Sequence, residues 1–170
     1  MILGAEFSPD RRYRWSLHRI WQPRAPLVCY VLLNPSTADE TTNDPTVSRC
    51  QIRALNAGYG GVLVVNIFAW RATDPAALYV VADPVGGLAN DMAITAAARK
   101  SKLVVCGWGM HGALQKRGEK VLELIRSTGK EPHALRINSD GSPKHPLYLS
   151  YKLQPTPLTL LQSVRGDRTT

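Results

Sequence analysis

The chain has 170 residues and a formal net charge of +8, with 44% of its residues hydrophobic and 20% charged. These values are ordinary for one globular domain with a single sizeable core. No apolar run approaches the roughly 18 residues of a membrane helix, and the first residues lack the basic, apolar and small-residue order of a secretory signal, so neither a membrane-spanning nor a secreted protein is expected.

The positive charge makes a polyanion the natural partner of this chain, with nucleic acid as the first choice. A basic surface without a specific partner explains the charge equally well, because the basic residues form no single run. The cysteines, Cys29, Cys50 and Cys106, lie in apolar or helical contexts without CxxC spacing. We therefore expect a cytoplasmic protein with reduced core cysteines, no disulfide and no cysteine-bound metal or cluster.

The N-terminal part of the chain predicts a hairpin followed by a buried strand. Residues 5–21 alternate aromatic and basic side chains, which is typical of an antiparallel hairpin, opening here at Ser8-Pro9-Asp10. The segment 27–33 is apolar or β-favouring throughout. Its lack of alternation predicts a strand that helices cover on both faces.

Strands and helices alternate along the rest of the chain. A helix is predicted from Asp44 and Pro45, because Asp caps a helix and Pro fits its first turn, to Gly58. The later elements are predicted as a strand over 62–67, a helix over about 87–100, a strand over 102–106, a helix over about 113–127 and a strand over 133–137. This order predicts an α/β fold with a parallel sheet and helices on both faces. Residues 1–170 are expected to form one domain, with a frayed tail after about residue 157.

The strand at 27–33 ends abruptly in Asn34 and Pro35. Pro35 stops the strand, since proline cannot donate to a ladder. Short polar side chains follow from Ser36 to Asp44. A plain connection with turn and capping hydrogen bonds explains this polarity, but it does not explain the position of Asn34 beside a core strand.

The carboxyl ends of parallel strands share one edge of a sheet, and ligands bind in a crevice there. Four side chains follow successive strands and are expected to face one another at this edge: Asn34, Asn66, Trp108 and His145. Each has a structural explanation as well, Asn66 as a partner of buried backbone groups, Trp108 as a lid on the core and His145 as an exposed turn residue. Together, in this order, they favour a binding or catalytic site.

The sequence lacks the motifs of several other kinds of site. The GxxxxGK(S/T) loop of nucleotide hydrolases, a GxGxxG turn after the first core strand and the GxSxG nucleophile elbow are all absent. The histidines, at positions 18, 111, 133 and 145, show no HExxH-like spacing, so no metal site is expected. What remains is a site built from amides, a carboxylate loop and one histidine.

Six segments of the chain resemble a bacterial and phage family that is catalogued only as a domain of unknown function. These segments are LNPSTAD, NDPTVSRC, GYGG, VVNIFAWRATDP, GWG and HPLYL, and they span nearly the whole chain. The resemblance is specific for membership of that family, and it implies no activity.

The order of the motifs also resembles the uracil-DNA glycosylase superfamily. This resemblance implies a three-layer α/β/α sandwich with a central, mainly parallel sheet of four to five strands, in addition to the N-terminal hairpin. LLNPS is similar to the GINPG-like motif of mismatch-type members. That likeness implies that Asn34 positions the attacking water and that Pro35 and Ser36 contact the substrate.

Two later motifs follow the order of the same superfamily. VVNIFAWRATDP is similar to the strand whose asparagine reads the uracil edge, which implies base recognition by Asn66, with Phe68 and Arg71 beside it. HPL is similar to the HPS motif, which implies that His145 stabilises the departing base and that Leu147 forms a minor-groove wedge.

The chain departs from that superfamily at several points. The aspartate of the most active members is absent from the first motif, Leu147 replaces the serine after HP, and the four cluster-binding cysteines of some members are missing. Trp108 is expected to contact the substrate, but no aromatic residue is assigned to stack on a flipped base.

The resemblance implies hydrolysis of the N-glycosidic bond of a damaged, mismatched or modified base in DNA, by a monomer that needs no metal, no other cofactor and no membrane. Base flipping would precede hydrolysis, with Leu147 or Tyr148 filling the gap. Asp39 and Asp44 are the possible acid or base, and a helix cap is the preferred role of Asp44 because Pro45 follows it. Two alternatives stay open: a catalytically silent nucleic-acid or nucleotide-binding module, and a hydrolase or transferase acting on free nucleosides or nucleotides.

Overall fold

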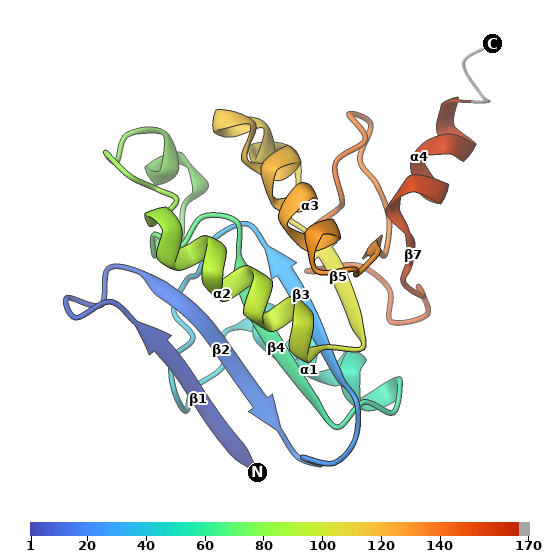
Figure 1. The fold of residues 1–170 in the computed structure, drawn as a ribbon, viewed down its shortest axis with the longest axis horizontal. Helices are drawn as coiled ribbons and strands as arrows, with labels where there is room; N and C mark the ends of the chain where they lie inside the picture. Colours follow the sequence, from blue (N-terminus) through green and yellow to red (C-terminus); the bar gives the residue numbers. More distant parts are fainter. Residues whose placement is uncertain (167–170) are drawn as a thin grey trace.

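The computed structural model describes residues 1–166, with side chains through residue 163. The strands of this part of the chain are β1 (Ile2–Phe7), β2 (Arg14–Ile20), β3 (Leu27–Leu32), β4 (Gly61–Asn66), β5 (Leu103–Gly107), β6 (Pro132–Ala134) and β7 (Thr156–Pro157). They form one seven-stranded sheet in the order β1-β2-β4-β3-β5-β6-β7 (Figure 1). Strands β4, β3, β5 and β6 are parallel, whereas the other neighbouring pairs are antiparallel.

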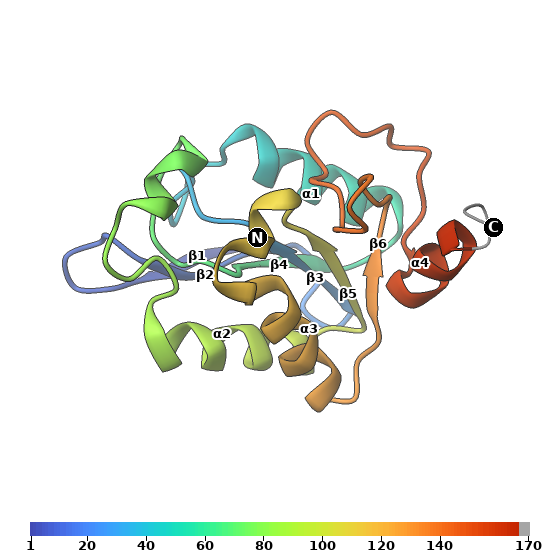
Figure 2. The same ribbon diagram turned by 90° about the horizontal axis from the view of Figure 1, so that it is seen from above.

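Helices connect or flank these strands on both faces of the sheet. They are α1 (Pro45–Asn56), α2 (Gly87–Lys100), α3 (Arg117–Ser127) and α4 (Leu158–Gly166), with 3₁₀ helices η1 (Pro75–Tyr79) and η2 (Met110–Lys116). Figure 2 shows α1 on one face of the sheet, α2 and α3 on the other, and α4 beside β6. The predicted mixed α/β fold is therefore confirmed. None of the described helices is long and apolar enough to cross a membrane.

Strand β3 is buried on both faces, as its uninterrupted apolar sequence predicts. Successive side chains of a strand point to opposite faces of the sheet. Val28 and Tyr30 pack in the core shared with α1, whereas Cys29 and Val31 pack in the core shared with α2 and α3. The cysteines of the chain are free and buried, as predicted, and burial raises the pKa of the Cys29 thiol to about 12.

Helix α1 begins where its sequence predicts. Asp44 has an extended backbone, and its carboxylate accepts a hydrogen bond of 2.9 Å from the main-chain N–H of Val47. Pro45 occupies the first turn, where its missing N–H costs no hydrogen bond. Val47, Cys50 and Ala54 then recur at helical spacing and are buried in the core shared with β3 and β4. The predicted capping role of Asp44 is confirmed.

The N-terminal hairpin is part of the sheet, so the sheet has more strands than the four to five predicted. β1 pairs with β2, with Ile2 opposite Ile20, and β2 pairs in turn with β4, with Leu17 opposite Val64. Without this partner, the edge of β4 would present a row of unpaired main-chain groups. Leu17 is fully buried, which joins the hairpin to the core.

Two buried arginines of β2 hold the loop between β3 and α1. Arg14 and Arg19 are 2% and 1% exposed. Arg14 donates to the main-chain oxygen of Ala38 at 3.1 Å, and burial lowers the pKa of Arg14 to about 10. The Arg19 guanidinium donates to loop oxygens of Asp39 (2.7 Å), Asn43 (2.9 Å), Glu40 (3.2 Å) and Thr42 (3.3 Å). These bonds fix the loop that ends at Asp44.

The helix predicted over 113–127 is shorter in the structure, because the chain first wraps around the indole ring of Trp108. η2 leads into α3 through non-helical backbone at Leu114 and Gln115. A Cβ on Gly118 would lie 2.8 Å from Trp108 Nε1, and a Cβ on Gly112 would lie closer still to the ring. The glycines let the ring pack against this segment, and α3 starts after the break.

The C-terminal part of the chain also differs from the prediction. The strand predicted over 133–137 ends at Ala134, and a helix, α4, follows residue 157. β7 pairs with β6 and leads into α4, whose Leu158 is fully buried. These contacts join segments that are distant in sequence, so no local pattern reveals them. Residues 167–170 lie outside the described residues.

The burial of Leu158 predicts that α4 contributes to stability. We expect Leu158→Ala to lower the free energy of unfolding by about 2–5 kcal/mol, since the substitution leaves a cavity, and to lower the Tm by roughly 5–15 °C. Leu160→Ala is the matched control, because Leu160 lies in the same helix but is 54% exposed. Thermal and urea unfolding of both variants checks this. Equal effects of the two substitutions would show that α4 is not integral to the fold.

Candidate functional site

The strand order creates a switch point between β3 and β5. β3 continues through α1 into β4 on one side, whereas β5 lies on its other side. In open α/β sheets, ligands bind outside the carboxyl ends of the strands where the order reverses in this way. The residues that follow the two strands at this point are Leu33 and Trp108.

Two pockets at this switch point form one groove, which we call the strand-end groove. They share Leu33, Pro75, His145 and Leu147. The Asn34 pocket has a volume of about 400 Å³, and its other lining residues are Asn34, Ser36, Thr37, Asp44, Pro45, Thr46, Ala72 and Thr73. The Trp108 pocket has a volume of about 760 Å³, and its other lining residues are Trp108, Gly109, Met110, His111, Ile137, Asn138, Ser139, Asp140, Lys144 and Tyr148.

Asn34 lines the smaller pocket with its amide held in one orientation. Its Nδ2 donates to the main-chain oxygens of Ala72 at 2.8 Å and Pro35 at 3.2 Å. The amide oxygen accepts no hydrogen bond from the described residues. A side-chain amide oxygen has two lone pairs, so Asn34 presents a fixed acceptor that can hold a water molecule in the pocket.

Asp44 lines the same pocket while it caps α1. One carboxylate oxygen accepts from Val47 N–H at 2.9 Å, and the other accepts a longer bond of 3.4 Å from Ala38 N–H. An ionised carboxylate has about four acceptor positions. Two of these are used by the main chain, so the carboxylate keeps acceptor capacity for a water or a substrate group while its charge stays in the pocket.

His145 lines both pockets and is held as a neutral ring. Its Nδ1 accepts a hydrogen bond of 3.2 Å from the main-chain N–H of Leu147, which leaves the proton of the neutral imidazole on Nε2. Burial lowers the pKa of His145, and the negative charge of Asp44 acts in the opposite direction. At neutral pH the ring is therefore an oriented donor in the groove, with a carboxylate close enough to influence it.

The turn after His145 holds an exposed aromatic ring at the rim of the Trp108 pocket. Tyr148 is 90% exposed, and its φ of 71° lies in the left-handed region that bulky residues rarely adopt. The buried Leu149 closes the turn by donating its N–H to Pro146 at 3.2 Å. Backbone conformations of this kind persist where packing imposes them and are frequent at functional sites.

His111 lies in the Trp108 pocket although no sequence pattern singled it out. Its Nδ1 is 2.8 Å from the hydroxyl of Tyr79, and the two rings meet edge to face. The segment that brings it there, GWGMHG over 107–112, has GxGxxG spacing after β5. Packing explains its glycines, because Gly107 lies against Pro146 and Gly112 against Trp108. The one sequence feature that could have indicated His111 is its position shortly after a core strand.

Three residues that were expected in the site lie elsewhere. Asn66 is buried, and its side-chain oxygen accepts from Arg14 Nη2 at 3.3 Å. Phe68 is fully buried in the core. Arg71 stacks over the ring of Phe7 in the hairpin. Strand order is the reason: β3 separates β4 from β5, so the end of β4 lies beside the hairpin and not at the switch point.

The other expected substrate-contacting residues lie in or beside the groove. Ser36 lines the Asn34 pocket, and Leu147 lines both pockets. Pro35 is buried, and its carbonyl oxygen accepts from Ala72 N–H at 2.9 Å, which joins the loops after β3 and β4. Trp108 lines the larger pocket but is only 3% exposed, so its ring serves mainly as part of the core.

The acidic loop divides into structural and groove-facing members. The Asp39 carboxylate accepts from the N–H groups of Thr41 and Thr42, which lowers its pKa and closes a turn outside the groove. Glu40 pairs with the exposed Arg11 through bonds of 2.6 and 3.0 Å. Asp44 is the acidic residue of this loop that faces the groove.

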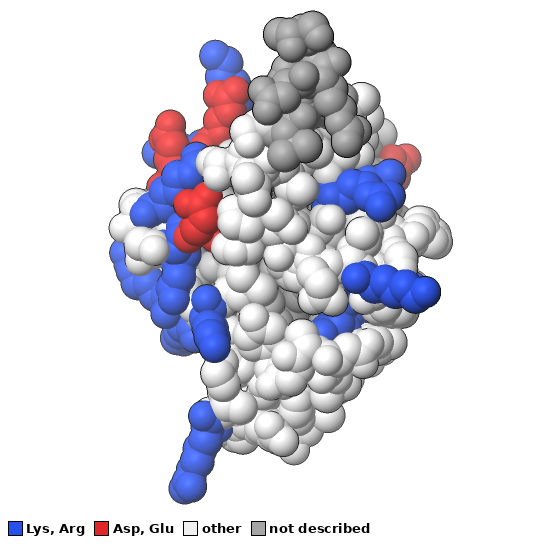
Figure 3. All heavy atoms as spheres, turned by 90° about the vertical axis from the view of Figure 1, so that its right-hand side faces the viewer, with Lys and Arg blue, Asp and Glu red and all other residues white. Residues whose placement is uncertain are grey.

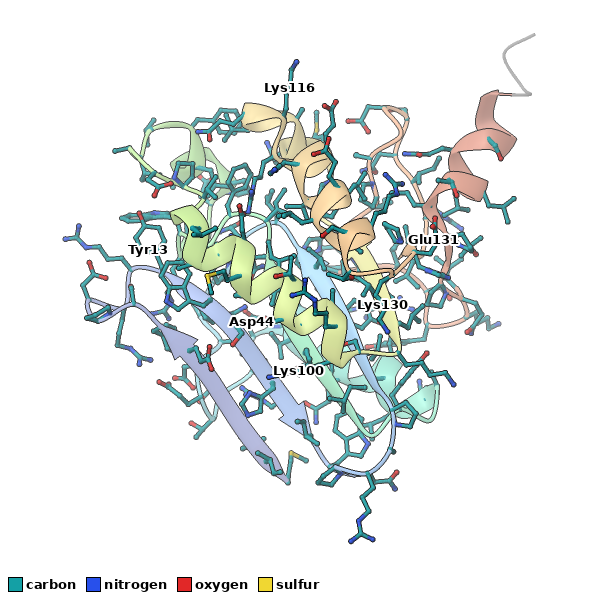
Figure 4. The ribbon with its side chains drawn as sticks, in the orientation of Figure 1. Tyr13, Asp44, Lys100, Lys116, Lys130 and Glu131 are labelled. Atoms are coloured by element: carbon teal, nitrogen blue, oxygen red, sulfur yellow. The ribbon has the colours of Figure 1, made fainter. Side chains whose placement is uncertain are left out.

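Basic side chains are divided between two flanks on one face of the molecule. On the face seen in Figure 3, Lys and Arg lie along both flanks of a mostly uncharged central band. Lys116 points away from the molecule at the start of α3 (Figure 4). Lys100 lies at the C-terminal end of α2, and Lys130 lies just after the C-terminal end of α3. Among the described residues, no group of three or more His, Cys, Asp and Glu side chains could hold a metal ion.

Comparison with known proteins identifies the family. A family model described as "Protein of unknown function (DUF1643)" matches residues 14–147. The chain belongs to this family. The match runs from the start of β2 to Leu147 and so includes Asn34, Asp44 and His145. No curated protein and no solved structure is significantly similar to the chain.

The neutral state of His145 predicts a dependence of stability on pH. The pKa of histidine in an unfolded chain is about 6.5, and the pKa of His145 is lower than this in the folded protein. Below pH 6.5 the unfolded state therefore binds a proton that the folded state excludes, so stability falls as the pH decreases from 6.5 toward the folded pKa.

We expect His145→Gln to reduce this loss of stability between pH 7 and pH 5, as measured by urea unfolding at several pH values. Part of the slope should remain, because burial also lowers the pKa of His18. The same pH slope in the variant and the parent protein would contradict a buried neutral His145.

Proposed function

We propose that this protein hydrolyses the N-glycosidic bond of a damaged, mismatched or modified base in DNA, with the target nucleotide bound in the strand-end groove. One observation carries the proposal: Asn34, Asp44 and His145 line a single pocket at the switch point of the sheet. Together they offer a fixed acceptor, a carboxylate and an oriented neutral donor, which are the groups that this reaction uses.

The reaction adds one water molecule across the bond between the sugar and the base. As the bond breaks, positive charge develops on the sugar and negative charge on the departing base. Asp44 stabilises the sugar cation, and Asn34 holds the attacking water through its amide oxygen. The His145 Nε2–H donates toward the base, and oriented donors of this kind typically contribute a few kcal/mol each in the transition state.

Asp44 offers a carboxylate in the pocket although the first motif lacks one. The most active uracil-DNA glycosylases have an aspartate in the first motif, and this chain does not. Asp44 follows later in the chain but lines the pocket that Asn34 lines. The helices on both faces of the sheet also agree with the three-layer α/β/α sandwich of that superfamily. These features support a glycosylase with a displaced carboxylate.

The Trp108 pocket is suited to an extruded base. Its volume of about 760 Å³ lies within the range of small-molecule sites, and it combines apolar walls with polar groups such as Asn138 and His111. Asn66 is bonded to Arg14 in the core, so base recognition is assigned to the polar groups of this pocket instead. Leu147 and the exposed Tyr148, at the rim, would fill the gap in the duplex.

We expect the protein to release a base from at least one of a set of oligonucleotides that contain uracil, mismatched thymine, hypoxanthine or phage-type modified bases. Asn34→Ala and His145→Gln should each lower the rate of abasic-site formation by roughly 100-fold or more, because each removes one transition-state contact. The rates are measured on single-stranded and duplex substrates. Absence of abasic product on every substrate, or an unchanged rate in Asn34→Ala, would refute the proposal.

Asp44→Asn separates catalysis from folding. Asparagine caps a helix about as well as aspartate, because its amide oxygen can accept the bond from Val47 N–H. α1 should therefore stay stable, while the charge in the pocket and the longer bond from Ala38 N–H are lost. We expect the rate to fall by about 100-fold or more with little change in Tm. Asp39→Asn is the matched control, because Asp39 lies in a turn outside the groove and its loss should leave the rate unchanged. A similar decrease in both variants would point to loop damage and not to chemistry.

One observation favours a second candidate, a catalytically silent nucleic-acid-binding module. Both carboxylate oxygens of Asp44 already accept main-chain hydrogen bonds, which restrains the carboxylate as a base. Such a module would bind DNA with an affinity that falls steeply with salt and would release no base. Parallel assays with free nucleosides separate both candidates from a nucleoside hydrolase.

A further inference from the structure

A second cavity lies on the α1 face of the sheet, at the other end of that helix. It has a volume of about 310 Å³ and is enclosed by the C-terminal half of α1, the start of β5 and the segment 151–155. We call it the α1 cavity. It shares no lining residue with the strand-end groove, so it is a separate site. Its apolar wall includes Leu103, Leu135 and Leu153.

Arg53 contributes a buried positive charge to this cavity. It is 6% exposed, and its Nη2 donates to the main-chain oxygens of Leu149 at 2.8 Å and Ser150 at 2.9 Å. Its Nε is buried without a hydrogen-bond partner. No ion pair among the described residues includes Arg53. A buried charge without a carboxylate partner is costly, and an anion in the cavity would compensate it.

Arg49 adds to the positive potential but stays outside the cavity. It lies one helical turn before Arg53, donates to the same Leu149 oxygen and is not a lining residue. The guanidinium groups of Arg49 and Arg53 lie 4.3 and 5.1 Å from the ring centroid of Tyr151. Neither Arg49 nor Arg53 has a carboxylate partner among the described residues, so one wall of the cavity is strongly electropositive.

Tyr30 supplies a second polar group without an internal partner. Its side chain lines the cavity and the residue is 3% exposed. Its hydroxyl makes no hydrogen bond with any described residue. The hydroxyl oxygen is not one of the fully buried unpartnered atoms, so it is accessible and can donate to a ligand in the cavity. Tyr30 and Arg53 therefore offer two donors to the same cavity, beside its apolar wall.

We propose that the α1 cavity binds a small organic anion, with a carboxylate contacting Arg53 and the Tyr30 hydroxyl. The aliphatic or aromatic body of the ligand packs against Leu103, Leu135 and Leu153. The volume is at the lower end of small-molecule sites, which restricts the ligand to a small molecule and excludes a polymer. This assignment does not depend on the reaction proposed for the strand-end groove.

Calorimetric titration with defined probes tests the site. The probes are acetate, butyrate, benzoate and 4-phenylbutyrate, with 4-phenylbutan-1-ol as the uncharged analogue and inorganic phosphate as the anion without an organic body. We expect at least one of the three larger carboxylates to bind at least tenfold more tightly than acetate, the alcohol and phosphate. No binding by any carboxylate, or equal binding by phosphate, would overturn the proposal.

Two arginine variants locate the bound probe. Arg53→Met should weaken the best carboxylate at least tenfold, because it removes the charge that lines the cavity. Arg49→Met is the matched control: it removes the neighbouring guanidinium, which contacts the same carbonyl and the same tyrosine but does not line the cavity, and should weaken binding much less than Arg53→Met does. Equal effects of the two substitutions would mean that the probe binds elsewhere.

Tyr30→Phe tests carboxylate binding in the α1 cavity even if Arg53→Met fails to fold. The substitution preserves the ring and removes only the hydroxyl that has no internal partner. We expect about fivefold weaker carboxylate binding, which corresponds to roughly 1 kcal/mol for one hydrogen bond, and an unchanged circular dichroism spectrum. Unchanged carboxylate affinity in this variant would overturn the assignment of the cavity.

Discussion

The hydrogen bonds from buried arginines to main-chain carbonyls are the interaction on which the rest of the structure depends. Arg14 and Arg19 reach from β2 into the loop between β3 and α1 and bind the oxygens of Ala38 and Asp39. A loop held in this way is restrained, because its carbonyls are turned inward onto buried guanidinium donors. Asp44 at its end can then cap α1 and face the groove at once. The hairpin, which lies outside the parallel core, thereby positions the candidate site.

Arginine side chains also bind main-chain carbonyls on the other side of α1. These interactions affect how the net charge is interpreted. Arg49 and Arg53 bind the carbonyl of Leu149, so both irregular segments around the groove are fastened by guanidinium groups. Among the residues whose side chains the structure describes, four arginines are buried: Arg14, Arg19, Arg53 and Arg117. Much of the formal charge of +8 is therefore structural, and the surface offered to a polyanion is less basic than the composition indicates.

The sequence predicted those features that local chemistry encodes. Asp44 and Pro45 specify the start of α1, and the apolar run of β3 specifies a strand covered on both faces. Features that depend on distant contacts were not predictable. The break before α3 follows from the ring of Trp108, and α4 is ordered by contact with β6. The site was predictable in part for the same reason: Asn34 follows β3, and His145 lies in the segment after β6 and lines the same pocket. The position of Asn66 depends on a strand order that periodicity cannot reveal.

The segment from Lys144 to Pro155 contains no helix or strand, yet it borders both cavities of the molecule. His145 stands at one end of it, Tyr151 near the other, and the carbonyls held by the arginines of α1 lie between them. A ligand that favours one arrangement of this segment would change affinity at the far cavity by a given factor, and reciprocity requires the same factor in the reverse direction. One irregular segment thus forms part of the wall of both cavities, so a ligand that moved it at one end of α1 would change the shape of the cavity at the other.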